Sequence, residues 1–522
     1  MKKGFVISIL FAAAISASAQ DFKFLQEKEP WLSGTNAAGL TRFGGSRISI
    51  VEGGYSKDNG GLIGTNESKD SYGAGIETES YMKYSDRMVF QGRLFWSNDE
   101  GKNMGGPVFM DPSYNSFNIY ETTSETAGKK TRELYGLAAG LGYRISDRIS
   151  LGGRIKYDCG DQTKKRDPRT LNKWMDLRLS AGLDWVVSDN MRLGADLRYR
   201  RTLEQITAGK YGMIDTDYFM YVDYGAGLSV KEIFQNDEGH ISLSNSRPLS
   251  NSFYGAGFQM EIGHRNKFTN EVSFLHRTGY FGKKSSTSVV FEECSGNEIS
   301  YKGSFLRYGA GSLDKAWVDA ALTTLNGERS VYTKVYQAGE ETRISYADPQ
   351  KSLDRTLINV EMGYTRYTGV KQNSFAYKYG AAVNLIGNKT KATYYPFYRN
   401  QNYTTAEITA FIQRNLSLKK GVLSLDAKAY FKTGSGKAAE DGAYASTSST
   451  NVVSADNWLY WQYDYETLSR AGVGLGIKHT KPIKSVKAYI GVNDNFTTLL
   501  ADSDNLPGTK RNSIKLIIGC IF

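Results

Sequence analysis

Residues 175–187 read MDLRLSAGLDWVV, and their two-residue alternation decides the fold class. Every odd position is apolar, and every even position except Val186 is charged or small. Successive side chains of a β-strand point to opposite faces, so this pattern predicts an amphipathic strand. A helix would instead scatter Arg178 and Asp184 among the apolar residues.

The same alternation recurs along the chain in hairpins. Segment 191–200 repeats it after the tight turn Ser188-Asp189-Asn190. Strands of ~11 residues match tilted segments that cross a bilayer and exceed the ~5–6 residues of an ordinary strand. Other short turns and several long polar loops separate these strands. We expect the turns at 146–148, 265–267, 387–389 and 481–482, and the long loops near 98–133, 203–252 and 433–463.

This pattern predicts an all-β fold, a transmembrane antiparallel up-and-down β-barrel of about 18 strands, with 14–20 possible for an even-numbered bacterial barrel. Short turns are then periplasmic and long loops extracellular. The count is open at 203–252 and 326–352, because Tyr218–Val230 has the pattern of either a wall strand or a surface-loop strand. The alternative fold is a soluble β-sandwich or propeller, which would have shorter strands and a polar outer face.

The composition of the 522 residues excludes several classes. A 40% hydrophobic content and a mean hydropathy of −0.44 exclude a multi-span helical membrane protein, whose spans each need ~20 mostly apolar residues. Three cysteines exclude a disulfide scaffold, and 13% aromatic residues argue against disorder. Only nine prolines suit uninterrupted strand ladders. A barrel also explains why so long a chain forms one domain.

The N-terminus has the three parts of a secretory signal peptide. Lys2 and Lys3 precede the apolar run 5–15, and Ala17-Ser18-Ala19 offers a small-residue cleavage site. The chain therefore divides into a signal peptide at 1–19, an N-terminal periplasmic or lumenal segment at 20–45, and the barrel at 46–522.

The C-terminus ends an alternating strand with Phe522. This resembles the signal that outer-membrane barrels present to the barrel assembly machinery. It implies a location in the outer membrane of a Gram-negative cell, in contact with lipid and lipopolysaccharide.

A short motif follows the signal peptide. Trp31 precedes Asn36-Ala37-Ala38-Gly39-Leu40, which resembles the Asn-Pro-Ala-Gly-Leu start of FadL-like outer-membrane barrels but lacks the proline. In that family the N-terminal segment plugs the barrel, and a lateral opening passes hydrophobic substrates. The whole chain resembles an uncharacterised family of outer-membrane barrels in Bacteroidota, and that resemblance implies fold and location but no activity.

Charged side chains occupy the face that would line the lumen. Two interpretations stay open. Rings of Arg and Lys would give a water-filled passage that favours anions, or opposite charges would pair and close the lumen as a polar core. Loop lysines could instead contact lipopolysaccharide. The lumen-facing candidates are Arg154, Lys156, Asp176, Arg178, Asp184, Arg192, Asp196, Arg198, Arg200, Glu261 and Lys378.

Motifs for catalysis are few. His240 and Ser242 would share one strand face, with Asn245 nearby, which resembles the catalytic group of the outer-membrane phospholipase. No zinc or calcium spacing and no phosphate-binding loop occurs, so we expect neither metal nor cofactor. A net charge of +11 comes without a nucleic-acid-binding module, so nucleic acid is not an expected partner. Cys159 and Cys294 lie in predicted loops and are candidates for a disulfide.

The sequence thus predicts a non-enzymatic outer-membrane barrel. Its expected role is a passive pore or a transporter of solutes or hydrophobic compounds. The first alternative is a structural barrel whose long loops bind surface proteins, without transport. The second is a membrane-embedded hydrolase that uses His240 and Ser242.

Overall fold

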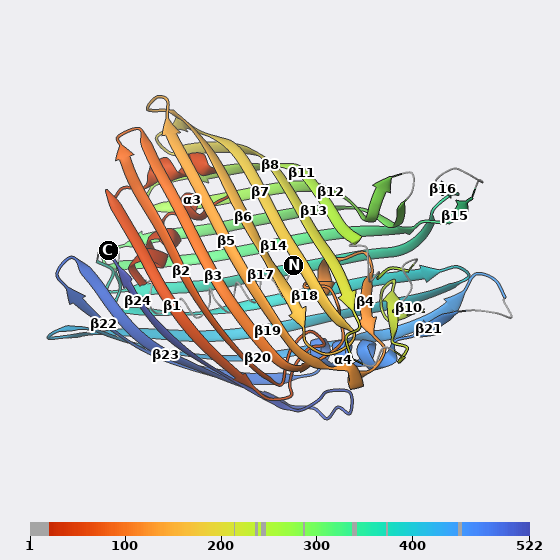
Figure 1. Ribbon diagram of the computed structural model, residues 1–522. Coiled ribbons are helices and arrows are strands. Elements are labelled where there is room, and N and C mark those ends of the chain that lie inside the picture. The colour runs from red at the N-terminus through yellow and green to blue at the C-terminus, as the bar shows by residue number, and fades with distance from the viewer. Residues whose placement is uncertain are drawn as a thin grey trace.

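Eighteen antiparallel strands form one closed sheet, in which β1 pairs with both β2 and the last strand, β24 (Figure 1). The predicted 18-strand barrel is therefore confirmed. The computed structural model describes residues 20–212, 215–234, 239–241, 247–285, 288–336, 342–371, 374–446 and 451–522. In this part of the chain, no helix has the length and apolar character needed to span a bilayer.

The wall strands are longer than predicted. They run from 12 residues in β24 to 23 in β20, because many of them continue past the membrane-crossing length into the long-loop end. In chain order they are β1 (Arg47–Asn59), β2 (Asp70–Ser85), β3 (Met88–Met104), β5 (Gly128–Arg144), β6 (Ile149–Lys164), β7 (Arg169–Ser188), β8 (Met191–Gly209), β11 (Arg247–Ile262), β12 (Asn266–Ser285), β13 (Ser288–Gly309), β14 (Ser312–Arg329), β17 (Gln350–Thr368), β18 (Tyr377–Tyr394), β19 (Phe397–Leu418), β20 (Gly421–Ala443), β22 (Arg470–Ile483), β23 (Val486–Leu499) and β24 (Lys510–Ile521).

Alternation gives the wall an apolar outer face and a polar inner face. Leu197, Phe258 and Leu475 point outward and are 70%, 66% and 65% exposed, whereas the inward carboxylates Asp176 and Asp184 are buried. The other described strands form two small sheets of four and two strands and add no second layer to the wall. A soluble sandwich would bury its apolar face and expose its charges. This barrel does the reverse.

The two ends of the barrel differ. One end carries only short connections, such as Asp86-Arg87 and Asp189-Asn190, and the longest connections, 105–127, 210–246 and 444–469, lie at the other. Short strands from these three connections pair as a separate four-stranded sheet, which we call the loop sheet (right in Figure 1). It contains β4 (Asn118–Glu121), β9 (Phe219–Asp223), β10 (Leu228–Ile233) and β21 (Val452–Ser454), and helix α4 (Asp456–Thr467) follows β21.

The two uncertain regions are now assigned. Tyr218–Val230 belongs to the loop sheet through β9 and β10 and not to the wall. In 326–352, β14 ends and β17 begins, and a small hairpin of β15 (Tyr332–Val335) and β16 (Arg343–Tyr346) lies between them.

Three local predictions were wrong. The expected turn at 481–482 lies within β22, where Pro482 pairs with Lys487, and the chain turns at Lys484 and Ser485 instead. The expected turn at 387–389 is an uninterrupted part of β18, where the Asn388 amide faces Gln401 across the ladder at 3.2 Å. Gly-Asn-Lys is a sequence that favours turns, but here Asn388 is a strand residue whose side chain points into the lumen. Cys159 and Cys294 lie in strands β6 and β13, not in loops, and both thiols are free.

Of the described residues before β1, those from 20 to 42 form three short helices at the short-turn end of the barrel (red in Figure 1). They are α2 (Gln20–Lys28), α3 (Pro30–Ser33) and the 3-10 helix η1 (Ala37–Arg42). We call residues 20–43 the N-terminal plug.

Candidate functional site: a lumen occupied from both ends

The Asn-Ala-Ala-Gly-Leu motif begins η1 and attaches it to the wall. The Oδ1 atom of Asn36 accepts a hydrogen bond from the amide of Ala38 at 3.1 Å, which is the N-cap geometry that starts a helix. The Nδ2 group of Asn36 donates to the carbonyl of Leu183 at 2.8 Å and to Oε1 of Gln259 at 3.1 Å. One side chain therefore serves both the helix and strands far away in the sequence.

Glycines of the wall make room for this helix. A Cβ atom at Gly152 would lie 2.2 Å from the carbonyl carbon of Ala37, and one at Gly182 would lie 2.3 Å from the Asn36 side chain. Gly152 is paired with both Gly142 and Gly182, so three neighbouring strands lack side chains at one level. The backbone of the plug therefore packs directly on the backbone of the wall.

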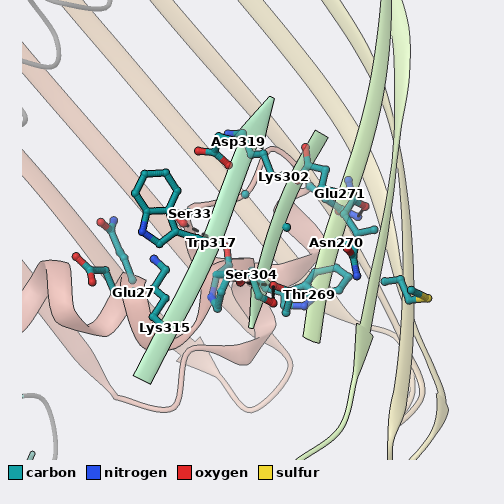
Figure 2. A pocket seen from close by; sticks show the side chains of 18 of the residues that line it. Glu27, Ser33, Thr269, Asn270, Glu271, Lys302, Ser304, Lys315, Trp317 and Asp319 are labelled. Carbon is teal, nitrogen blue, oxygen red and sulfur yellow. Dashed lines mark hydrogen bonds between the residues drawn. The ribbon is translucent and has the colours of Figure 1, made fainter. Parts of the chain in front are cut away.

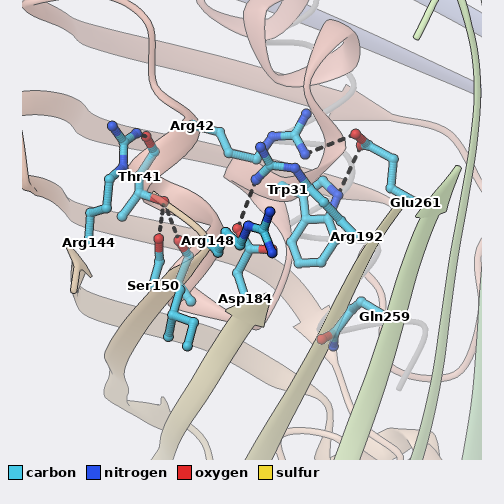
Figure 3. A network of polar contacts seen from close by, with 12 residues as sticks. Trp31, Thr41, Arg42, Arg144, Arg148, Ser150, Asp184, Arg192, Gln259 and Glu261 are labelled. Carbon is cyan, nitrogen blue, oxygen red and sulfur yellow. Dashed lines mark hydrogen bonds and ion pairs between the residues drawn. The ribbon is translucent and has the colours of Figure 1, made fainter. Parts of the chain in front are cut away.

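Polar contacts surround the same helix (Figure 3). Arg42 binds Glu261 at 3.0 Å and Glu29 at 2.8 Å, and the indole of Trp31 donates to Glu261 at 3.1 Å. Burial alone would lower the pKa of Arg42, but the two carboxylates raise it above its ordinary value. Arg42 therefore stays charged, and it connects the plug to β11 through a charge-assisted contact.

Aromatic side chains hold α2. Phe22 stacks on Tyr81 with ring centroids 5.4 Å apart, and Phe24 packs against Tyr367 at 4.9 Å. Both phenylalanines are almost fully buried, at 2% exposure. The plug is thus bound by apolar packing as well as by hydrogen bonds.

A second segment enters from the other end. Residues 105–127, which we call the inserted loop, include η2 (Pro112–Tyr114) and η3 (Ser124–Thr126). Lumen-facing side chains bind its backbone. Arg277 donates to the carbonyl of Tyr114 at 2.9 Å, Arg355 to that of Asn115 at 3.2 Å, Arg132 to that of Met110 at 2.8 Å and Asn172 to that of Val108 at 2.9 Å, and Glu204 accepts from the amide of Met110 at 2.8 Å.

The tip of the inserted loop reaches between arginines of the wall. The Tyr114 ring lies 4.3 Å from the guanidinium of Arg277 and 5.2 Å from that of Arg200, which are cation–π distances. Burial raises the pKa of Tyr114 above its ordinary value, so the phenol stays neutral. Phe109 and Phe117 of the same loop join the apolar core under the loop sheet.

The predicted lumen-facing charges all lie on the inner face, and most contact a neighbour or the plug. Most of these side chains form ion pairs with other charged side chains of the wall. Three of them, Arg154, Glu261 and Lys378, contact the plug instead. The contacts are Asp176 with Arg178 (2.6 Å) and Arg200 (2.9 Å), Asp184 with Arg192 (3.0 Å), Asp196 with Arg198, Arg198 with Glu271 (2.7 Å), Lys156 with Asp158 (2.8 Å), Arg154 with the carbonyl of Gly34 (2.5 Å), and Lys378 with Glu27 (3.3 Å).

His240, from the hydrolase alternative, lies in the apolar core below the loop sheet. Its Nδ1 atom lies 2.9 Å from Oε1 of Glu232, and its ring packs on Phe291 with centroids 4.7 Å apart. Burial alone would raise the pKa of Glu232, but contacts with His240 lower it to about 2. Ser242 and Asn245 lie outside the described residues, so the hydrolase stays a prediction. Among the described side chains, no group of three His, Cys, Asp or Glu is placed to hold a metal ion.

The C-terminal residue completes the ring. The backbone of Phe522 exchanges two hydrogen bonds with Ser49 of β1, at 3.0 and 2.8 Å, and the Arg47 guanidinium lies 5.2 Å from its ring. The last residue of the chain is therefore part of the seam that closes the barrel.

A family model matches residues 37–522, from the first residue of η1 to the C-terminus. The chain belongs to the family of unknown function DUF6850. This match covers the whole wall together with the helix that docks on it. No curated protein matches the sequence.

Several solved structures are similar in outline. The ferric preacinetobactin receptor BauA of Acinetobacter baumannii is 8% identical with a TM-score of 0.39, covering 91% of this chain and 79% of that one. The ferric citrate transporter FecA is 9% identical at a TM-score of 0.38, covering 91% and 78%. The TodX ΔS2S3 mutant, a monoaromatic hydrocarbon channel, is 10% identical at a TM-score of 0.30, covering 93% and 92%.

Proposed function

We propose that this protein is a closed passage for small hydrophilic solutes across the outer membrane. The plug and the inserted loop close it, and displacing them opens it. The observation that carries the proposal is how the lumen is occupied. An 18-stranded wall is of the size that leaves an aqueous channel in porins. Here, side-chain contacts rather than the wall itself hold two separate chain segments in that space.

The outer face supports the membrane location. Large apolar side chains such as Leu197 and Phe258 stay exposed, at 70% and 66%, in the part of the chain that the structure describes. Removing such side chains from water stabilises a protein by about 25 cal/mol per Å² of apolar area, and a lipid bilayer supplies that environment. We further propose that lipid and lipopolysaccharide surround the barrel and that the assembly machinery recognises the strand ending at Phe522.

One observation favours a different function. The lumen charges pair with close neighbours such as Asp184 with Arg192, which also suits a permanently closed polar core. The loop sheet would then bind surface proteins, and the barrel would only anchor it. This alternative predicts no passage in any variant, so a permeability test separates it from the proposed function.

Permeability of intact cells tests the proposal. A Gram-negative host would express the whole chain or a variant that lacks residues 20–43 and has a short Gly-Ser linker in place of 107–126. The host lacks its own porins, so we expect the variant to sensitise cells to a small hydrophilic β-lactam antibiotic, while the whole chain leaves resistance unchanged. Surface labelling confirms that both barrels reach the outer membrane. Unchanged resistance with a surface-exposed variant would support the anchoring alternative.

A pair of lysine substitutions on β19 tests the membrane location. Ile412 is outward and 51% exposed, whereas Thr409 lies on the inner face. A lysine on the lipid face near the bilayer midplane costs about 2–4 kcal/mol, and one in the lumen costs much less. Ile412→Lys should therefore lower the free energy of unfolding in lipid vesicles by about that amount, and Thr409→Lys serves as the control. Equal effects of the two substitutions would argue against a lipid-facing outer surface.

A further inference from the structure

A cavity of about 360 Å³ lies between the plug and the inner faces of β12, β13 and β14 (Figure 2). Its volume is in the range of sites for small ligands. The plug contributes Trp31 and Ser33, and the wall contributes Ser304 and Trp317. A ligand in this cavity would contact both the fixed wall and the segment that closes it.

One row of side chains dominates the wall of the cavity. Lys315, Trp317 and Asp319 alternate along β14 and therefore share its inner face (Figure 2). Lys302 of β13 is the register partner of Asp319 and points to the same side. An indole ring is thus flanked by two ammonium groups and one carboxylate.

These three charges differ from the other charges around the cavity. Glu27 is paired with Lys378 and Glu271 with Arg198. Within the described part of the chain, Lys302, Lys315 and Asp319 form no ion pair within 4 Å and no hydrogen bond. Lys302 and Asp319 are also exposed to the lumen. These three groups together carry one net positive charge, and Lys23 of the plug adds a further ammonium group to the lining of the cavity.

The chemistry of these groups narrows the ligand. Two ammonium groups favour a carboxylate, because charge-assisted hydrogen bonds are the strong ones. Asp319 accepts hydrogen bonds only, so a ligand beside it must also offer donors such as hydroxyl groups. The face of Trp317 packs best on a flat apolar surface. A sugar ring with a carboxylate has all three features, whereas an aromatic acid without hydroxyl groups would set its carboxylate near Asp319 with nothing to donate.

We propose that this cavity binds an acidic saccharide of one or two sugar units. The inference rests on the proposed function, because it names the class of solute that would pass. Lys302 and Lys315 bind the carboxylate, Trp317 stacks on the ring, and Asp319 accepts from its hydroxyl groups. Because the plug forms the opposite side, the ligand binds at the boundary that must separate when the passage opens.

Calorimetric titration of the purified barrel in detergent tests the site with three probes: D-glucuronate, D-glucose and glycylglycine. We expect glucuronate to bind about tenfold more tightly than glucose, which lacks the charged group. The double variant Lys302→Gln, Lys315→Gln should lose that advantage and leave the weak binding of glucose unchanged. Trp317→Ala should weaken both sugars. Lys173→Gln, at an exposed lysine of β7 that does not line the cavity, should change nothing.

Two results would overturn the assignment. Equal affinity of glucuronate for the whole barrel and for the double lysine variant would show that the two lysines form no carboxylate site. Tighter binding of glycylglycine than of glucuronate would indicate a site for zwitterions. Circular dichroism checks that each variant keeps its barrel. The titration uses the closed barrel, so its outcome does not depend on the outcome of the permeability test. Binding without permeability refutes the passage alone, and permeability without binding refutes the site alone.

Discussion

A valine at position 152 should displace the N-terminal plug and expose it to protease. Gly152 faces η1, and a Cβ atom there would lie 2.2 Å from both the carbonyl carbon of Ala37 and the amide nitrogen of Ala38. Both contacts are to backbone, so no side-chain rotation relieves them. Overpacking of this kind costs about 1–3 kcal/mol, so the undocked population should rise about 5- to 150-fold. Trypsin should then cleave after Lys28 or Arg42 at a correspondingly higher rate.

The neighbouring glycine provides a matched control. Gly153 lies on the opposite face of β6, and only the carbonyl oxygen of Ser180 lies within 4 Å of its built Cβ, at 3.9 Å. Gly153→Val should therefore leave the rate of cleavage in the plug unchanged. If both valine variants resist trypsin as the original chain does, the plug is not seated by the glycines of the wall.

Replacing Arg277 with methionine should release the inserted loop. Arg277 is 3% exposed. Its guanidinium donates one hydrogen bond to the carbonyl of Tyr114 and two to the side-chain oxygen Oδ1 of Asn251. Methionine keeps the apolar volume but removes all three charge-assisted bonds. Such bonds contribute about 1.5–3 kcal/mol each, and a net loss of about 3 kcal/mol corresponds to ~100-fold more frequent local opening.

Hydrogen exchange measures that opening directly. The amides of Val108 and Met110 are bonded to the carbonyl of Ile119 and to Glu204, so they report on the inserted loop. Their exchange should accelerate about 100-fold in Arg277→Met, while amides of the wall strands keep their protection. Arg307→Met, at an exposed arginine near a short turn, is the control. Equal protection in both variants would show that the loop holds its place without Arg277.

The wall could be predicted from the sequence because a strand encodes its two faces locally. The alternation in 175–187 assigns Asp176 and Asp184 to one face and Leu183 to the other, whatever the neighbours of the strand are. Counting such segments gave about 18 strands, and the even-number rule for bacterial barrels left 14–20 possible. The ends of the strands were harder to predict from the sequence, because the alternation near 387–389 is compatible with either a turn or a continuous ladder.

The contents of the lumen could not be predicted in the same way. Asn36 meets Leu183 and Gln259, which lie 147 and 223 positions away, and no local pattern encodes such a contact. The same holds for Arg277 and Tyr114, a pair 163 positions apart. The nearest signal was the run of small residues after Asn36, which marks a close backbone approach but not its partner. From the sequence, the glycines that pack against this run could be predicted only to be small residues of the wall.

Ion conductance in planar lipid bilayers tests the central claim, that two removable segments close a passage. Four barrels should be compared: the whole chain after residue 19, one without residues 20–43, one with 107–126 replaced by a Gly-Ser linker, and one with both changes. We expect the whole chain to be closed, the single variants to conduct at an intermediate level, and the double variant to form stable open channels. A folded double variant that conducts no more than the whole chain would contradict the central claim.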